Sequence, residues 1–399
     1  MLCLALALLS WEGSGHSTPL RPTLQDPCVE WKGSTYTLDR LPSEVGPGPA
    51  AAAETWADWV VEHDYRMHLS ANARVLLIRS PSSGEWERQL ELIGRTSVLF
   101  DELVPLPKRD ADPPVGDGRG VAAGGADGAP EDSGVTDSAS GEYSYSYTWG
   151  AGTWPLETET CVMFAVSTEA DYAAVLARLG ELEPYLRHWV ESAGRFTGFV
   201  LEKPLIGAYI EQASGQNEWD PENEVVHRVA EMLLVRRFAQ LPFWLVQGLA
   251  WHVEMELTGG LYCFPYRSEF VSATEHVGWE ADLGERLRKG ERGPLRLEEI
   301  AGWDRGRFEE GPAKLAYGLV RFLARHHRPN LSAFVEQLRL FRDEHSRVDL
   351  GNGGWERKTN YRIPDEELMS LLQAHFRGSV LDDATDFLRQ GTGFRLSKE

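Results

Sequence analysis

Beyond Pro221, apolar residues recur at spacings of three and four positions, the spacing of one face of an α-helix. The pattern runs through five successive segments, so most of the second half of the chain is predicted to be helical. These segments are residues 222–238, 242–257, 312–327, 331–344 and 365–388. Such helices must bury their apolar faces against one another or against a sheet.

The first half of the chain carries the strand signals. Two short apolar runs predict strands, and each is followed by helical spacing: residues 73–78 then 86–103, and residues 161–166 then 170–193. A further stretch, residues 196–210, contains Pro204 and Gly207 and suits an irregular or edge strand better than a central one. We therefore predict an α+β fold, in which a small N-terminal strand–helix part and a sheet precede a mostly helical second half.

Residues 107–152 interrupt this pattern with a stretch rich in Gly, Ala, Asp, Ser and Pro. Such a composition buries too little apolar surface to offset the loss of chain entropy, so we predict a disordered acidic insert. The insert separates the N-terminal strand–helix part, residues 54–106, from the main domain, residues 153–390.

The N-terminus carries an apolar run over residues 2–9. This run is far shorter than the roughly 20 residues that a membrane-spanning helix needs. Together with the small residues Gly13 and Gly15, it predicts a signal peptide within residues 1–20. We therefore expect a secreted protein, or one located in the periplasm or cell envelope, without a membrane span.

The charge of the chain limits its partners. The formal net charge is −21 and the pI is about 5.0. Nucleic acids and anionic membrane surfaces are also negative, so the charge argues against both as partners. The sequence also lacks a phosphate-binding glycine loop, a G-x-S-x-G nucleophile motif and a dinucleotide-binding fingerprint.

Two neighbouring helical segments carry the only specific motifs. The first contains His227, Arg228 and Glu231 within an apolar helix, and the second reads Leu-Pro-Phe-Trp-Leu-Val-Gln-Gly-Leu-Ala over residues 241–250. This pair resembles the paired helices of gluzincin zinc metallopeptidases, in particular the peptidase MA-like domains, which carry HExxH and then a helix close to P-x-W-L-x-E-G-x-A. The second frame is matched at Pro242, Trp244, Leu245, Gly248 and Ala250.

The resemblance implies that the metal site has degenerated. Of HExxH only His227 is kept, because Arg228 stands at the general-base position and Glu231 at the second histidine. Gln247 replaces the third ligand, a glutamate. A guanidinium has no lone pair with which to accept a proton, and an amide is a weaker ligand than a carboxylate. The resemblance therefore implies no catalytic residue, no bound metal and no cofactor, with His227, Glu231 and Gln247 as the vestigial metal positions.

Neighbouring residues offer no convincing replacement ligands in the sequence. Glu224 and Glu231 are seven residues apart, about 10.5 Å along a helix axis, while His252 and Glu254 lie five and seven positions beyond Gln247. We expect Arg228 to pair with Glu231 and to hold Gln247 in a polar network. A plain helical ion-pair chain of Glu224, Arg228 and Glu231 is the alternative interpretation.

The functional hypothesis is an exported, catalytically inactive metallopeptidase-like protein that acts by binding a peptide or an envelope protein. The competing hypothesis is an active zinc metallohydrolase, a peptidase with a rearranged metal site. A carbohydrate-active enzyme is a more distant third, based only on the 14 tryptophans and the many carboxylates.

Overall fold

The computed structural model describes residues 27–81, 86–105, 159–211, 220–239, 241–263, 278–303, 310–349, 355–357, 361–376, 378–391 and 394–395. The predicted signal peptide and the predicted insert of residues 107–152 lie outside these ranges. Among the described residues, no helix is long and apolar enough to cross a membrane.

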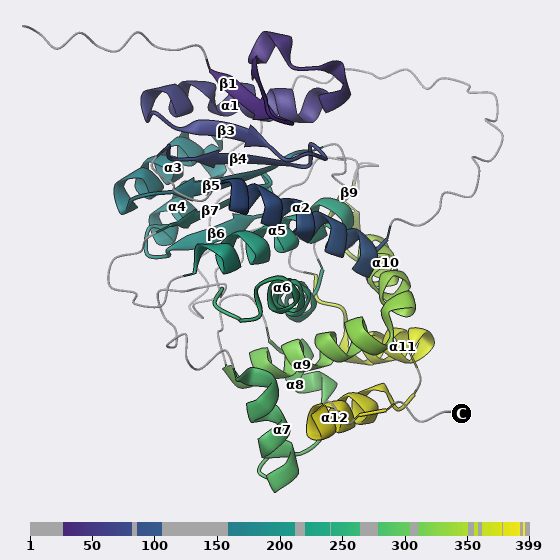
Figure 1. The fold of residues 1–399 in the computed structure, drawn as a ribbon. Helices are drawn as coiled ribbons and strands as arrows, with labels where there is room; N and C mark the ends of the chain where they lie inside the picture. Colours follow the sequence, from purple (N-terminus) through teal and green to yellow (C-terminus); the bar gives the residue numbers. More distant parts are fainter. Residues whose placement is uncertain are drawn as a thin grey trace, which may run out of the picture.

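A seven-stranded mixed sheet forms the first half of the fold (Figure 1). Its order is β2-β1-β3-β4-β5-β7-β6. The strands are β1 Cys28–Trp31, β2 Ser34–Thr37, β3 Arg66–Leu69, β4 Val75–Arg79, β5 Cys161–Val166, β6 Gly198–Leu201 and β7 Ile206–Ile210. Strands β4, β5 and β7 are parallel, whereas β2 and β6 are antiparallel edge strands. Strands from residues 54–106 and from residues beyond 153 thus lie side by side in one sheet.

Helices cover both faces of this sheet. On one face lie α1 Pro47–Glu62 and α3 Glu169–Leu182, and on the other lie α2 Trp86–Leu103 and α5 Pro221–Phe238. Buried strand residues alternate accordingly between the two cores. In β5, the first core takes Val162, Phe164 and Val166, and the second takes Cys161, Met163 and Ala165. A strand buried on both faces reads as a continuous apolar run, as this one does.

The second half of the chain is a helical layer beneath α5 (Figure 1). Helix α6 lies between α5 and α9, so it is buried on both sides. The remaining helices of this half pack on α9 or on one another. The helices are α6 Phe243–Thr258, α7 Trp279–Lys289, α8 Leu297–Ala301, α9 Glu310–His326, α10 Arg328–His345, α11 Asp365–His375 and α12 Val380–Gln390, with a small hairpin of β8 Arg347–Asp349 and β9 Trp355–Arg357.

The predicted fold class is confirmed, since the strands occupy mainly the first half and the helices the second. Helix α2 and strand β5 have the predicted bounds. Two predicted helices are each divided: a 3-10 turn starting at Pro184 follows α3 and leads into α4 Arg187–Ala193, and a turn containing Gly378 separates α11 from α12. Proline lacks the N–H that would continue the first helix.

The prediction of an edge strand over residues 196–210 was wrong for its second part. Pro204 lies in the turn between β6 and β7, where it removes no bond from the ladder, so β7 is an interior strand. Gly207 serves close packing there, because a Cβ atom at this position would lie 2.9 Å from Met163 Cε. The hairpin β1–β2 and helix α1, residues 28–62, have no counterpart in the prediction.

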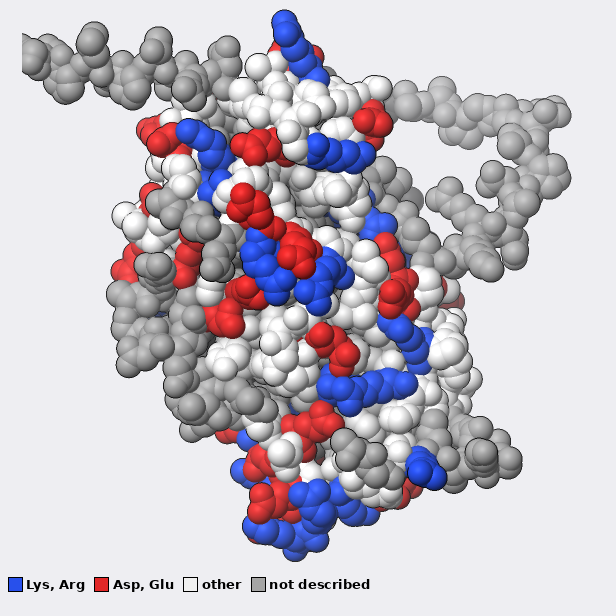
Figure 2. Space-filling model, viewed as in Figure 1, with Lys and Arg blue, Asp and Glu red and all other residues white. Residues whose placement is uncertain are grey.

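Charged side chains on the surface are extensively paired. Ion pairs join Arg88 to Glu222 and Arg328 to Glu102 across different elements. Figure 2 shows acidic and basic side chains in adjacent positions across the face that it draws. The excess of acidic residues therefore does not make this face uniformly negative.

A buried histidine lies in strand β3, inside the sheet. The His68 ring in β3 is 0% exposed, and its Nε2 accepts a hydrogen bond from Arg79 Nε at 3.0 Å. Its Nδ1 lies 3.1 Å from a carboxylate oxygen of Glu30, and the ring stacks on Trp86. Because Nε2 accepts a bond, the ring is neutral. Burial, and then the positive charges of Arg79 and Arg66, lower the pKa of His68 to about 4.

Acid is therefore expected to destabilise the protein through His68. Its pKa is about 4 in the folded state and about 6.5 in an unfolded chain, so between these values the unfolded state binds more protons. Its contribution to stability is complete above pH ~6.5 and is lost as the pH falls towards ~4. We expect a loss of about 1–2 kcal/mol between pH 7 and pH 5. Urea denaturation at the two pH values measures it.

The matched variants are His68→Gln and His188→Gln. His188 is exposed on α4 and should leave the pH dependence unchanged, whereas His68→Gln should reduce its slope. Part of the slope will persist, because burial also lowers the pKa of His252. An identical loss of stability in wild type and His68→Gln would show that this ring does not contribute.

Candidate functional site: a buried polar cluster between two helices

Helix α5 carries the polar residues of the site while being buried almost all round. Its first turn is fixed by Asp220, whose side chain accepts a hydrogen bond from Glu222 N at 2.9 Å, and by Pro221 at the first helical position. The helix then runs between the sheet and α6. Polar residues on it therefore need partners within the protein.

Helix α6 packs closely against α9 at Gly248. A Cβ atom at this position would lie 2.6 Å from Val320 Cγ2 and 3.1 Å from the Ala316 carbonyl oxygen. The glycine is therefore required by the close approach of two helices. Trp244, four residues earlier, is 1% exposed and belongs to the core, not to a surface platform for a sugar. These packing residues hold Gln247 towards α5.

The three vestigial metal positions meet between the helices, as predicted. Gln247 Oε1 lies 3.1 Å from His227 Nε2, and Gln247 Nε2 donates a hydrogen bond to Glu231 Oε1, also at 3.1 Å. All three side chains are at most 5% exposed. The amide of Gln247 thus bridges a histidine and a carboxylate on α5.

Glu254 orients His227 from the opposite side. Its Oε2 lies 2.9 Å from His227 Nδ1, while its Oε1 accepts hydrogen bonds from the Asn223 amide and from the backbone N–H groups of Tyr262 and Cys263. The sequence offered Glu254 only as an unconvincing replacement ligand, so this orienting role was not predicted. The signal was present, because Asn223 precedes His227 by four residues and Glu254 follows Gln247 by seven, so that each pair shares a helix face.

These contacts determine where the protons of His227 lie. Glu254 is an acceptor at Nδ1, and Gln247 presents its carbonyl oxygen at Nε2 because its amide nitrogen donates to Glu231. Both ring nitrogens of His227 therefore face oxygen acceptors, Glu254 at Nδ1 and Gln247 at Nε2. A metal ligand would need a lone pair on one of these nitrogens.

Arg228 forms its ion pair with Glu224, as the alternative interpretation expected, whereas Glu231 acts on it through its charge. It was expected to pair with Glu231, but its Nε donates to Glu224 Oε2 at 2.8 Å, and its terminal nitrogen lies 2.7 Å from the same oxygen. The pair is buried, with Arg228 1% and Glu224 0% exposed. The guanidinium packs on Gly198 of β6, where a Cβ atom would lie only 2.5 Å from Arg228 Nη2. The absence of a Cβ atom at Gly198 leaves the room in which Arg228 reaches Glu224.

The residues present do not fit a catalytic zinc ion. The donors that converge are one imidazole, one carboxylate and one neutral amide, with Arg228 beside them. Zinc sites prefer three histidine, cysteine or carboxylate ligands. Within the described ranges, no group of three or more His, Cys, Asp or Glu side chains is arranged to hold a metal ion. The hydrogen bonds of the cluster connect α5, α6 and the segment of residues 260–263.

Comparison with known proteins adds no assignment: no protein family matches the chain, and no curated protein matches it either. The resemblance to gluzincins thus depends on the residues of the helix pair.

Proposed function

We propose that this protein is an exported, catalytically inactive relative of the gluzincin metallopeptidases that acts by binding a peptide or another protein of the cell envelope. One observation carries the proposal. The general-base position of the motif is occupied by Arg228, which is locked in a buried ion pair with Glu224. An arginine in such a pair can neither accept a proton from water nor leave room for a dication next to it.

The orientation of His227 supports the same proposal. In zinc enzymes, a carboxylate commonly accepts a hydrogen bond from the ring nitrogen that does not bind the metal, and Glu254 lies where such a group would lie. The other nitrogen meets Gln247. An orienting carboxylate beside an altered ligand set is what loss of the metal from a metalloenzyme scaffold would leave.

One experiment tests inactivity and binding together. The purified full-length protein is loaded with Zn²⁺, dialysed and analysed for metal, and is then incubated with a random peptide library. We expect no stoichiometric zinc, and we expect the retained peptides to be recovered intact by mass spectrometry. N-terminal sequencing of the exported protein tests the signal peptide separately.

A different result would support the competing hypothesis. One zinc ion per chain that is lost in His227→Ala, together with metal-dependent cleavage of library peptides, would establish an active metallohydrolase with a rearranged site. Failure to retain any peptide would count against the binding role while leaving the inactive site unaffected.

A further inference from the structure

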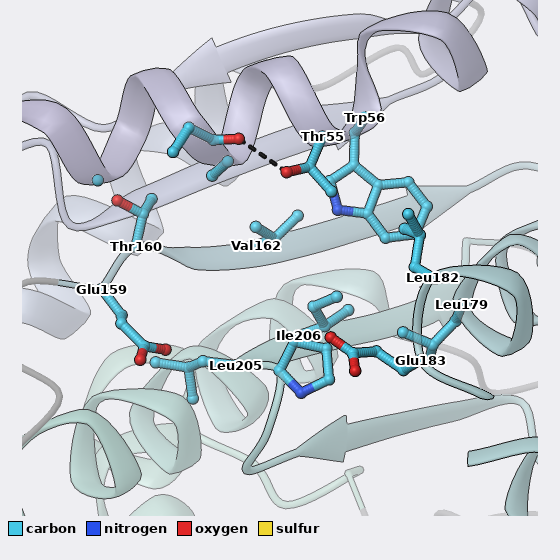
Figure 3. A pocket seen from close by; sticks show the side chains of 14 residues that line it. Thr55, Trp56, Glu159, Thr160, Val162, Leu179, Leu182, Glu183, Leu205 and Ile206 are labelled. Atoms are coloured by element: carbon cyan, nitrogen blue, oxygen red, sulfur yellow. Dashed lines mark hydrogen bonds between the residues drawn. The ribbon is translucent and has the colours of Figure 1, made fainter. Parts of the chain in front are cut away.

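A cavity lies on the opposite face of the sheet from the helix pair (Figure 3). Its volume is about 340 Å³, which is at the small end of the range for ligand pockets. Helix α1, the end of α3, the start of β5 and the turn before β7 line it, and it is partly open to solvent. Its lining residues Trp56, Val162, Leu179 and Ile206 belong to the core between the sheet and α1, not to the core that contains α5 and α6.

The hollow exists because α1 presents small side chains. Gly48, Ala51, Ala52 and Thr55 recur at helical spacing and line the cavity on this side. Apolar side chains line the rest, including Leu182 from α3. A helix face of glycine and alanine opposite larger residues leaves a gap that the described residues do not fill.

The charged groups of the cavity are both acidic. Figure 3 shows the carboxylates of Glu159 and Glu183 on either side of Leu205. The Thr55 hydroxyl donates to the Ala51 carbonyl oxygen at 2.8 Å and is therefore occupied as a donor. Among the described residues that line this cavity, none is a lysine or an arginine.

The two carboxylates differ in their surroundings. Arg236 donates to the backbone oxygen of Glu159 at 2.7 Å, and both Arg236 and Lys203 act on the Glu159 carboxylate from outside the cavity. The Glu183 carboxylate, in contrast, makes no hydrogen bond or ion pair with the residues that the structure describes. Glu183 is thus the anionic group that a bound cation would satisfy.

We propose that this cavity binds a compact ligand with an apolar body and one protonated amine. The apolar lining takes the body, and Glu183 with Glu159 takes the ammonium group. A carboxylate ligand would meet two like charges and is disfavoured, and a neutral ligand would gain no charge attraction from Glu183. The site is distinct from the polar cluster of the helix pair, because most of its apolar lining lies in the core on the other face of the sheet; Glu159 is the point at which it contacts α5, through Arg236.

Calorimetric titration of the full-length protein tests the proposal with three probes of one shape: 2-phenylethylamine, 2-phenylethanol and 3-phenylpropanoate. We expect the amine to bind most tightly and the carboxylate most weakly. Glu183→Gln should weaken binding of the amine about two- to fivefold, and the double variant with Glu159→Gln should weaken it about tenfold. Binding of the alcohol should not change in either variant.

Two variants control for indirect effects. Glu181→Gln changes an exposed carboxylate of the same helix that pairs with Arg178 outside the cavity, and it should leave all affinities unchanged. Ala51→Phe places a large side chain at an exposed lining position and should abolish binding of the amine while the circular dichroism spectrum is retained. Equal affinities for the three probes, no binding at several millimolar amine, or an unchanged affinity in the double variant would overturn the proposal.

Discussion

Replacing Glu224 by glutamine is expected to lower the free energy of unfolding by about 3–5 kcal/mol, because it leaves the buried Arg228 without its counter-charge. Both side chains are at most 1% exposed, so water cannot replace the lost carboxylate. The neighbouring turn is affected as well, because Cys263 Sγ donates to the same carboxylate oxygen at 3.4 Å. Urea denaturation followed by tryptophan fluorescence measures the loss.

The control for this prediction is Glu222→Gln on the same helix. Glu222 pairs with Arg88, but both side chains are about one-third exposed, so the expected loss is only about 0–1 kcal/mol. The double variant Glu224→Met/Arg228→Met should recover most of the lost stability, since an apolar pair of similar size can replace a buried ion pair. If the double variant were less stable than Glu224→Gln alone, Arg228 would be stabilised by something other than Glu224.

The sequence predicted the elements whose apolar pattern is regular and missed those stabilised by tertiary packing. Strand β5 and helix α2 have continuous or amphipathic patterns, and their bounds were predicted. Helix α1 begins Pro-Gly-Pro-Ala-Ala-Ala, which carries little periodic signal, and it is placed by the burial of Trp56 and Trp59 against the sheet. Strand β7 was predicted to lie at an edge of the sheet, because Pro204 and Gly207 indicated an irregular strand. The turn between β6 and β7, which contains Pro204, was not recognised in the sequence.

The site shows the same division between local and non-local information. The resemblance of the helix pair to gluzincins implied that His227, Glu231 and Gln247 would meet, and they do. The partner of Arg228 was not predictable from spacing, because Glu224 lies four residues before it and Glu231 three residues after it, and both are helical neighbours. The choice depends on the packing against Gly198, which is 30 residues distant in the sequence.

The variant Glu231→His/Gln247→Glu is expected to bind one zinc ion per chain, where we expect the wild-type protein to bind none. The two changes restore the ligand set of the motif around His227 while leaving Arg228 paired with Glu224. Two ligand atoms of a tetrahedral zinc ion are about 3.4 Å apart, and His227 Nε2 and Gln247 Oε1 are already 3.1 Å apart. Elemental analysis after dialysis, and a rise in the thermal midpoint on adding Zn²⁺, measure the gain.

Zinc binding without hydrolysis is the specific outcome expected of this variant, because Arg228 still cannot act as a base. Adding Glu254→Gln should weaken zinc binding about 10–100-fold, since Glu254 orients His227 through Nδ1. Adding His227→Ala should abolish it. If the double variant folds but binds no zinc, then the contacts among His227, Glu231 and Gln247 are not those of a former metal site, and the helix pair is a structural polar cluster. Peptide cleavage by the double variant would instead require another base, contrary to the proposal that hydrolysis was lost with the base at the position of Arg228.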